Sequence, residues 1–334
     1  MEQLEGAIDS LAHRIRFSGV VRVDLAGGVG FAKAYGSADR GHDLPNQIDT
    51  QFGVASGTKG LTALAVVSLI EEGVLDRETT ARSVLGKDLA LIADDVTVEH
   101  LLAHRSGIGD YLDEYEDHEI DDYMMPLSVH ELATTEGYVQ VLDGHPTKFR
   151  AGTQFAGSNS GYVVLALIAE RGSGTPFHEL VSHRVCEPAG MADTHFLRSD
   201  ALPGRAAFGY IDEVGLRTNV FHLPVRGCGD GGVYTTAADV RSLWTAFFAG
   251  RIVSEDWLRE MVRPQSNVPE HGRRYGLGFW VHESRDLVIL NGSDPGVSFR
   301  TVHDPASGST HTVISNTSDG AWPITELLDG LLDM

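Results

Sequence analysis

A serine and a lysine three residues apart form the strongest candidate for chemistry in this chain. Ser56-Gly57-Thr58-Lys59 opens a helix-like apolar stretch, and residues three apart share one face of a helix, so the lysine amine can reach the serine hydroxyl. A serine hydroxyl is a weak nucleophile until a base takes its proton, and a neutral lysine can be that base. A helix start also directs a backbone N–H and the positive dipole end at a substrate oxygen. The spacing therefore favours acyl transfer through Ser56.

Other patterns in the chain predict structure rather than chemistry. Gly-x-Ser-x-Gly, a Walker loop and His-Glu-x-x-His are all absent. The segment 227–232 satisfies Gly-x-Gly-x-x-Gly literally, but it lacks the strand–turn–helix setting of a dinucleotide site, so a tight turn is predicted. His100 and His104 stand one helical turn apart without a third ligand, which predicts structural roles. We therefore expect neither a cofactor nor a metal.

The composition narrows the class of protein further. The 334 residues carry 26 basic and 47 acidic side chains, for a net charge of −21. Such a surface repels phosphate backbones and anionic lipid, so no nucleic-acid or membrane partner is expected. Cys186 and Cys228, the two cysteines, cannot form a disulfide framework. The acidic N-terminus and the short apolar runs predict a soluble cytoplasmic protein.

The elements that must position the serine and the lysine follow from hydrophobic periodicity. Helical spacing predicts helices at 4–15, 56–70, 237–248 and 321–332. Apolar runs of β type predict strands at 17–25, 30–35, 276–282, 287–291, 297–303 and 310–315. Strands at both ends with helical segments between them predict an α+β fold, an antiparallel β-sheet flanked by helices with an inserted, mostly helical region. Residues 1–75 and 205–334 are assigned to the sheet domain and 76–204 to the helical domain.

Several segments together resemble one known family. They are Phe52-Gly53-Val54-Ala55-Ser56-Gly57-Thr58-Lys59, Val98-Glu99-His100-Leu101-Leu102-Ala103-His104-Arg105-Ser106-Gly107-Ile108, Phe149-Arg150-Ala151-Gly152, Gly209-Tyr210, Gly229-Asp230-Gly231-Gly232-Val233-Tyr234-Thr235-Thr236, Tyr275-Gly276-Leu277-Gly278-Phe279 and Pro295-Gly296-Val297-Ser298. In order and approximate spacing this set resembles the β-lactamase-related serine hydrolases, which include class C β-lactamases, D-alanyl-D-alanine carboxypeptidases and family VIII esterases. The resemblance implies a β-lactamase/transpeptidase-like fold, in agreement with the predicted elements.

The resemblance also implies roles for individual residues. Ser56 and Lys59 match the family's nucleophile and base, and Asn159 matches the asparagine that orients the lysine and the substrate amide. The backbone N–H groups of Ser56 and Ser293 are implied as oxyanion donors. Further substrate contacts are expected from Tyr111, Gly157, Tyr210, Asn291 and Gly292.

Two positions depart from the family pattern. The second motif, Tyr-x-Asn, corresponds here to Gly157-Ser158-Asn159, so the tyrosine that relays a proton to the leaving group is missing. The third motif, Lys-Thr-Gly or His-x-Gly, corresponds to Leu290-Asn291-Gly292, without its basic residue. Tyr111 or Tyr210 could supply a hydroxyl instead, but each is expected to be a wall residue. We expect Lys59 to act alone or with a water in the space left at Gly157.

These observations predict a serine hydrolase that acts on small esters or amides through a Ser56 acyl-enzyme. One alternative is an acyltransferase that uses the same acyl-enzyme, and another is a catalytically impaired binding protein of the same fold. The run 110–122 holds eight carboxylates in thirteen residues. It is expected to be a solvated face, although a position near the entrance would attract an amino-bearing substrate.

Overall fold

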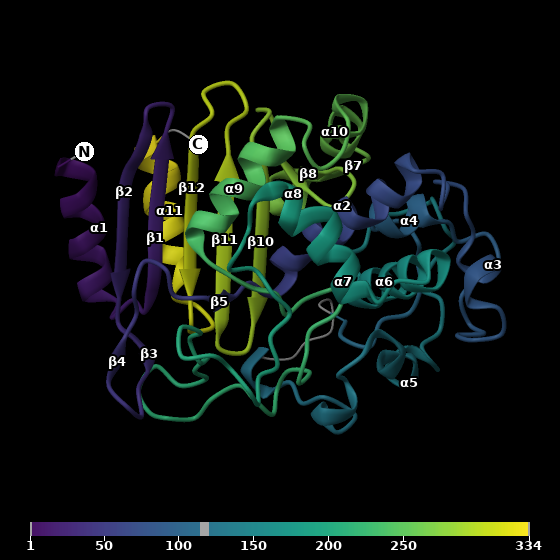
Figure 1. Cartoon of the computed structure of the whole chain (residues 1–334), viewed down its shortest axis with the longest axis horizontal. Helices are drawn as coiled ribbons and strands as arrows, with labels where there is room; N and C mark the ends of the chain where they lie inside the picture. Colours follow the sequence, from purple (N-terminus) through teal and green to yellow (C-terminus); the bar gives the residue numbers. More distant parts are fainter. Residues whose placement is uncertain (1, 114–119, 333–334) are drawn as a thin grey trace.

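An eight-stranded antiparallel sheet occupies one side of the computed structural model, which describes residues 2–113 and 120–332 (Figure 1). The strand order is β2-β1-β12-β11-β10-β9-β8-β7, so the first two strands of the chain lie beside the last one. The strands are β1 Gly19–Leu25, β2 Gly28–Tyr35, β7 Ser266–Val268, β8 Arg273–Tyr275, β9 Trp280–His282, β10 Val288–Asp294, β11 Val297–His303 and β12 Thr310–Ser315.

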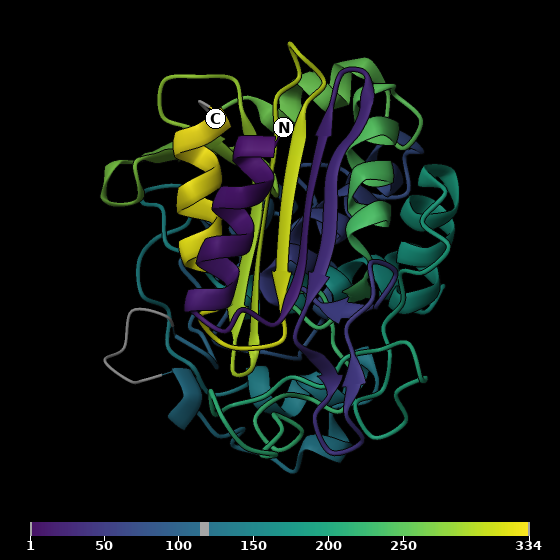
Figure 2. The same cartoon turned by 90° about the vertical axis from the view of Figure 1, so that its left-hand side faces the viewer.

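Helices cover both faces of this sheet. The terminal helices α1 (Glu2–Arg14) and α11 (Ala321–Leu332) lie side by side on one face (Figure 2). The other face packs against α2 (Thr58–Glu71) and α9 (Ala237–Phe248). Successive side chains of a strand point to opposite faces. Accordingly, Val21 of β1 packs with α1 and α11, whereas its neighbour Val20 belongs to the core around α2.

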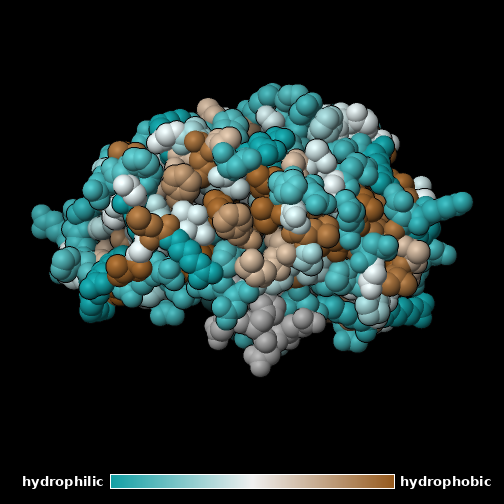
Figure 3. Space-filling model, turned by 90° about the horizontal axis from the view of Figure 1, so that it is seen from below, coloured by the Kyte–Doolittle hydropathy of each residue, from teal (hydrophilic) through white to brown (hydrophobic). Residues whose placement is uncertain are grey.

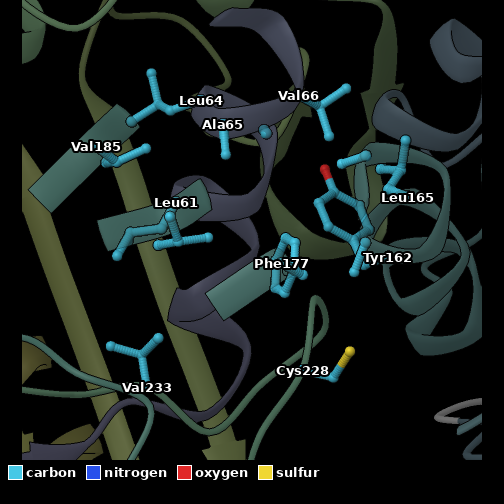
Figure 4. Close-up of a cluster of buried hydrophobic side chains, with 14 of the residues drawn as sticks. Leu61, Leu64, Ala65, Val66, Tyr162, Leu165, Phe177, Val185, Cys228 and Val233 are labelled. Atoms are coloured by element: carbon cyan, nitrogen blue, oxygen red, sulfur yellow. The ribbon is translucent and has the colours of Figure 1, made fainter. Parts of the chain in front are cut away.

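A second part of the molecule is built around α6 (Asn159–Ser173), and it includes α3 Ala81–Leu85, α4 Val98–Leu102, α5 Val139–Leu142 and α7 Phe177–Val181. Two further short helices, α8 Glu187–Ala189 and α10 Glu255–Val262, contact α9. Helix α2 is apolar on every side and is buried from Thr58 to Leu69, as expected of a helix in the centre of a core. Figure 4 shows Leu61 and Val66 of α2 in the same buried cluster as Tyr162 and Leu165 of α6, with Val66 toward Tyr162.

The predicted α+β architecture is confirmed, with two local differences. The predicted strand 276–282 begins only at Trp280, because Gly276 and Phe279 close a turn through an N–H···O bond of 2.9 Å. Strands β7 and β8 were not predicted, since three residues are too few for a periodic signal. The domain boundaries at 75/76 and 204/205 remain predictions. In the described ranges, no helix combines the length and apolar character needed to cross a membrane.

Candidate active site

A strained turn presents Ser56 at the start of α2. Residues Ala55–Gly57 form a 3-10 turn, η1, that leads directly into the helix. Ala55 is buried with a φ of 46°, a left-handed conformation that costs a non-glycine residue of order 1–3 kcal/mol. The turn is held by the Val54 N–H, which donates to the Val233 carbonyl at 3.0 Å. Packing on both sides therefore fixes the Ser56 backbone.

The Lys59 amine is surrounded by three hydrogen-bond partners. Its Nζ lies 2.6 Å from Ser56 Oγ, 2.7 Å from Asn159 Oδ1 and 3.0 Å from the Asp230 backbone oxygen. The amide and carbonyl oxygens can only accept hydrogen bonds, so each takes one N–H of the amine. The third direction points at the Ser56 hydroxyl. The Lys59 amine and the Ser56 hydroxyl are therefore in direct hydrogen-bond contact.

Asn159 is fixed by the way α6 begins. The buried Asp110 carboxylate accepts the backbone N–H groups of Asn159 and Ser160 at 2.8 and 2.9 Å, satisfying donors that a helix start leaves free. The Asn159 Nδ2 donates to the Leu112 carbonyl at 2.9 Å. This bond identifies Oδ1 as the atom that faces Lys59. Burial raises the pKa of Asp110, and its bonds to the α6 backbone oppose that effect.

Strand β10 passes directly beside the serine turn. A Cβ on Gly292 would stand 2.3 Å from the Val54 oxygen and 2.6 Å from the Ser56 nitrogen, so only glycine allows this approach. Strand β10 pairs with β9 only at Val288 and Ile289. Beyond that point, in the described part of the chain, the register between β10 and β9 does not continue. The predicted oxyanion donor Ser293 lies in this stretch.

A cavity of about 320 Å³ opens over the Ser56 hydroxyl. Its described lining combines apolar side chains with tyrosines and two aspartates. The lining residues are Ser56, Tyr111, Leu112, Tyr123, Met125, Tyr138, Asn159, Leu197, Ser199, Asn219, His222, Leu223, Pro224, Val225, Gly227, Asp230, Gly231, Gly232, Tyr234, Asn291, Gly292, Ser293, Asp294 and Pro295. Figure 3 shows apolar side chains gathered near the middle of the face seen from below.

Five predicted residues meet at this cavity in addition to Ser56. They are Tyr111, Asn159, Asn291, Gly292 and Ser293. The Tyr111 hydroxyl donates to the Asp230 carboxylate through a short hydrogen bond. The Asn291 Oδ1 accepts a hydrogen bond of 3.0 Å from Arg273. The structure thus joins residues from four separate parts of the chain.

Two predicted contact residues are not among the described residues that line the cavity. Tyr210 is buried elsewhere: its hydroxyl accepts the Arg40 N–H at 2.7 Å, and the Arg40 guanidinium lies 4.1 Å from its ring centre. Arg40 therefore holds the ring and the hydroxyl of Tyr210, and a contact between Tyr210 and the substrate remains a prediction. Gly157 is half-buried just before α6. At the third motif, Leu290 is buried against Gly60 of α2.

The structure also shows functional candidates that the sequence reasoning missed. Asp230 stands in a glycine-rich segment that predicts a tight turn and resembles the family, with no role implied for its side chain, and its buried carboxylate lines the cavity. Tyr123, Tyr138 and Tyr234 line it as well. Asp110 was treated as one charge of an acidic run, whereas its carboxylate caps α6. Residues 114–119 of that run lie outside the described residues. A lone carboxylate within an apolar or glycine-rich segment is the signal that could have marked Asp230.

The two histidines one turn apart have separate structural partners. His100 Nδ1 accepts the Thr97 N–H at 3.3 Å in the capping box of α4. His104 Nδ1 accepts the Ser158 N–H at 3.1 Å, and burial holds the pKa of His104 well below its usual value. Each imidazole therefore supports the backbone of a neighbouring segment.

Comparison with known proteins places the chain in a family. Residues 4–329 match the Beta-lactamase family, so the chain belongs to it. This membership confirms the resemblance drawn from the sequence motifs, and the large antiparallel sheet with its helices has the β-lactamase/transpeptidase-like fold. The family includes penicillin-binding proteins and esterases.

Individual relatives cover most of the chain. Penicillin-binding protein 4* of Bacillus subtilis is 25% identical over 336 residues, which span 95% of this chain and 72% of that protein. Esterase EstB of Burkholderia gladioli is 30% identical over 311 residues, spanning 83% of this chain and 78% of that protein. The crystal structure of a penicillin-binding protein from Bacillus halodurans matches with a TM-score of 0.91 and 31% identity, covering 97% and 99% of the two chains.

Proposed function

We propose that this chain is a serine hydrolase that cleaves small esters or amides through a Ser56 acyl-enzyme. The observation that supports this most strongly is the position of the Lys59 amine. Its nitrogen donates hydrogen bonds to the Asn159 side-chain oxygen and the Asp230 backbone oxygen, and it lies 2.6 Å from Ser56 Oγ. A base within this distance of a hydroxyl can remove its proton as the oxygen attacks.

The proposed reaction proceeds in two stages, acylation of Ser56 and hydrolysis of the acyl-enzyme. Ser56 Oγ bonds to the substrate carbonyl carbon while its proton moves to Lys59 Nζ. The bond to the leaving group then breaks, and Lys59 returns the proton to the departing oxygen or nitrogen. In the second stage a water attacks the acyl carbon, Lys59 takes the water proton, and the ester bond to Ser56 breaks with return of that proton to Oγ. The backbone N–H groups of Ser56 and Ser293 stabilise the oxyanion in both stages.

Lys59 serves both proton transfers because neither candidate tyrosine is available to replace the phenol absent at Gly157. The Tyr111 hydroxyl donates its hydrogen bond to the Asp230 carboxylate. The Tyr210 hydroxyl is bound to the Arg40 backbone outside the cavity lining. A single base that must both accept and return the proton favours leaving groups that depart as stable anions.

Labelling with a fluorophosphonate tests the nucleophile. We expect intact-protein mass spectrometry to show one added label, and Ser56→Ala to abolish it while thermal unfolding stays cooperative. Ser199→Ala is the matched control, because Ser199 lines the same cavity without a basic partner in the lysine's position. This variant should label like the parent. A label retained by Ser56→Ala would contradict the acyl-enzyme.

The products formed from the acyl-enzyme distinguish hydrolysis from acyl transfer. With an ester substrate and an added primary amine or alcohol, hydrolysis predicts mainly the free acid. Predominance of the amide or the new ester would identify an acyltransferase instead. Absence of both labelling and turnover would identify a binding protein.

A further inference from the structure

Four tyrosines of the described residues line the cavity at the candidate active site. Tyr111 and Tyr123 come from the loop after α4, Tyr138 from the short turn η4 (Thr135–Tyr138), and Tyr234 from β6 (Tyr234–Thr235). Burial is the first cause that raises the pKa of all four phenols, to about 12 for Tyr123 and Tyr234. The rings are therefore neutral near pH 7. A neutral tyrosine ring has an electron-rich face, and all four residues line the cavity.

Two carboxylates share the cavity with these rings. Asp230 is buried and bonded to the Tyr111 hydroxyl, and it also acts on the pKa of Tyr123 and Tyr138. Asp294 acts on the pKa of Tyr234, and its Oδ2 lies 3.8 Å from the Cβ position of Gly231. The rings and both carboxylates are thus within electrostatic reach of each other. We call these six residues the tyrosine–aspartate cage.

Among the described residues that line the cavity there is neither a lysine nor an arginine. The Lys59 amine, which is not part of this lining, lies 3.0 Å from the Asp230 backbone oxygen and lowers the pKa of the Asp230 carboxyl against the effect of burial. The imidazole in the lining, His222, lies with Nδ1 2.9 Å from the Tyr123 carbonyl and Nε2 3.2 Å from Arg217. A carbonyl only accepts and a guanidinium only donates, so Nδ1 carries the proton, Nε2 accepts, and the ring is neutral. At the third motif, Leu290 is buried and adds no charge.

We propose that the tyrosine–aspartate cage binds an ammonium group carried by the acyl part of the substrate, and so selects cationic acyl groups over neutral ones of the same shape. Aromatic rings attract an alkylammonium ion through their negative faces, and the carboxylates supply the opposite charge. The same charges disfavour substrates that carry a carboxylate at this point. The net charge of −21 adds a long-range attraction for cations. This inference rests on the proposed function, because it assigns a substrate class to the same cavity.

Two matched pairs of p-nitrophenyl esters test the selection. The first pair compares the 4-(trimethylammonio)butanoyl ester with the 5,5-dimethylhexanoyl ester, in which carbon replaces the charged nitrogen. The second compares the 3-aminopropanoyl ester with the butanoyl ester. We expect kcat/KM, corrected for spontaneous hydrolysis, to favour the cationic member of at least one pair by about tenfold or more. The neutral tert-butyl group is the more hydrophobic, so a preference for ammonium reports recognition of charge.

The variants separate the cage from the general surface charge. Asp230→Asn should reduce the cationic-to-neutral ratio of kcat/KM at least fivefold, because it removes the attraction between one carboxylate and the ammonium group. Asp256→Asn on α10 is the control, since Asp256 is exposed and its substitution changes the net charge equally. It should leave the ratio within twofold. A parent ratio near one in both pairs, or equal effects of the two variants, overturns the cage.

A binding measurement keeps this test independent of catalysis. In the Ser56→Ala variant, calorimetry should find tighter binding of 4-(trimethylammonio)butanamide than of 5,5-dimethylhexanamide, or of 3-aminopropanamide than of butanamide. If the parent turns over no ester but this difference remains, the hydrolase proposal fails and the cage stands. If esters are turned over without any charge preference in rate or binding, the cage fails and the hydrolase proposal stands.

Discussion

The hydrogen-bond partners of the Lys59 amine determine how its nitrogen is oriented toward Ser56. The partners Asn159 and Asp230 lie 100 and 171 positions away in the chain, and both present oxygens that only accept hydrogen bonds. An amine held in this way is oriented by an amide oxygen and a backbone carbonyl, neither of which is a carboxylate oxygen. Geometry therefore favours a base at this position over a structural ion pair.

Replacing Lys59 by arginine tests this role. The guanidinium keeps the positive charge but cannot give up its proton in a protein, so Lys59→Arg removes the base. We expect kcat for an activated ester to fall by about two to three orders of magnitude or more. Steady-state kinetics beside circular dichroism measure the effect and check the fold. Activity within tenfold of the parent would assign the base to another group.

Restoring a tyrosine at position 157 tests the proton path to the leaving group. Gly157 stands two residues before Asn159, whose side chain reaches Lys59. A phenol there is expected to donate to a departing nitrogen, which needs protonation far more than a nitrophenolate does. Gly157→Tyr should raise amide turnover relative to ester turnover and reduce the size of tolerated acyl groups.

The ratio of kcat/KM for matched amide and ester substrates, measured in the parent and in Gly157→Tyr, gives the result directly. Bulky and small acyl groups are compared in the same series. An unchanged ratio together with undiminished turnover of bulky esters would show that position 157 lies outside the proton path.

At the scale of elements, the site depends on how closely β10 approaches the serine turn. Gly292 leaves no room for a side chain between the strand and the backbone of Val54 and Ser56. Helix α6 contributes the other fixed point, because Asp110 holds its first backbone N–H groups. The candidate catalytic groups are thus carried by three elements: the turn that begins α2, the strand β10 and the start of α6. None of these elements could move alone without separating them.

Adding one methyl group to β10 is expected to disrupt this junction. In Gly292→Ala the new Cβ would meet the Val54 oxygen at 2.3 Å, so the strand or the turn must shift. A displacement near 1 Å of reacting groups lowers the rate by about a hundredfold. Gly204→Ala is the control, because nothing lies within 4 Å of its Cβ position. Equal kcat values for the two variants would contradict the proposed role of this contact.

At the scale of the whole molecule, buried histidines link stability to pH. His303 stacks on Trp244 at 5.5 Å between ring centres, and burial lowers its pKa to about 4. The unfolded chain, with an ordinary pKa near 6.5 for this group, then binds more protons below that pH. The stability contributed by neutral His303 is present above pH 6.5 and is lost as the pH falls toward 4.

Between pH 7 and pH 5 this group lowers the free energy of unfolding by roughly 2 kcal/mol. Carboxyl groups whose pKa is raised by burial, Asp110, Asp230 and Asp239, act in the opposite direction. Urea unfolding of the parent and of His303→Gln at both pH values isolates the histidine. The difference between pH 7 and pH 5 should be smaller in His303→Gln, and an identical difference in the two proteins would refute the assignment.

Local sequence was sufficient for features that depend on neighbours along the chain. The Ser56–Lys59 pair follows from helix spacing, and the long strands β1, β10, β11 and β12 follow from apolar runs. Motif order was enough to identify the family and its fold. Three-residue strands such as β7 and β8 escaped, because pairing with neighbouring strands stabilises them rather than any property of their own residues.

Tertiary structure alone decided which distant groups share the cavity. Asp230 stands in a glycine-rich run that reads as a turn, and only the approach of that run to Lys59 and Tyr111 gives its carboxylate a role. Tyr210 is a residue type that commonly lines pockets, yet its hydroxyl accepts a hydrogen bond from the Arg40 backbone outside the described lining of this cavity. Periodicity reports which face of an element is buried. It carries no information about what that face meets, because contacts between residues more than a hundred positions apart arise only when the whole core has packed.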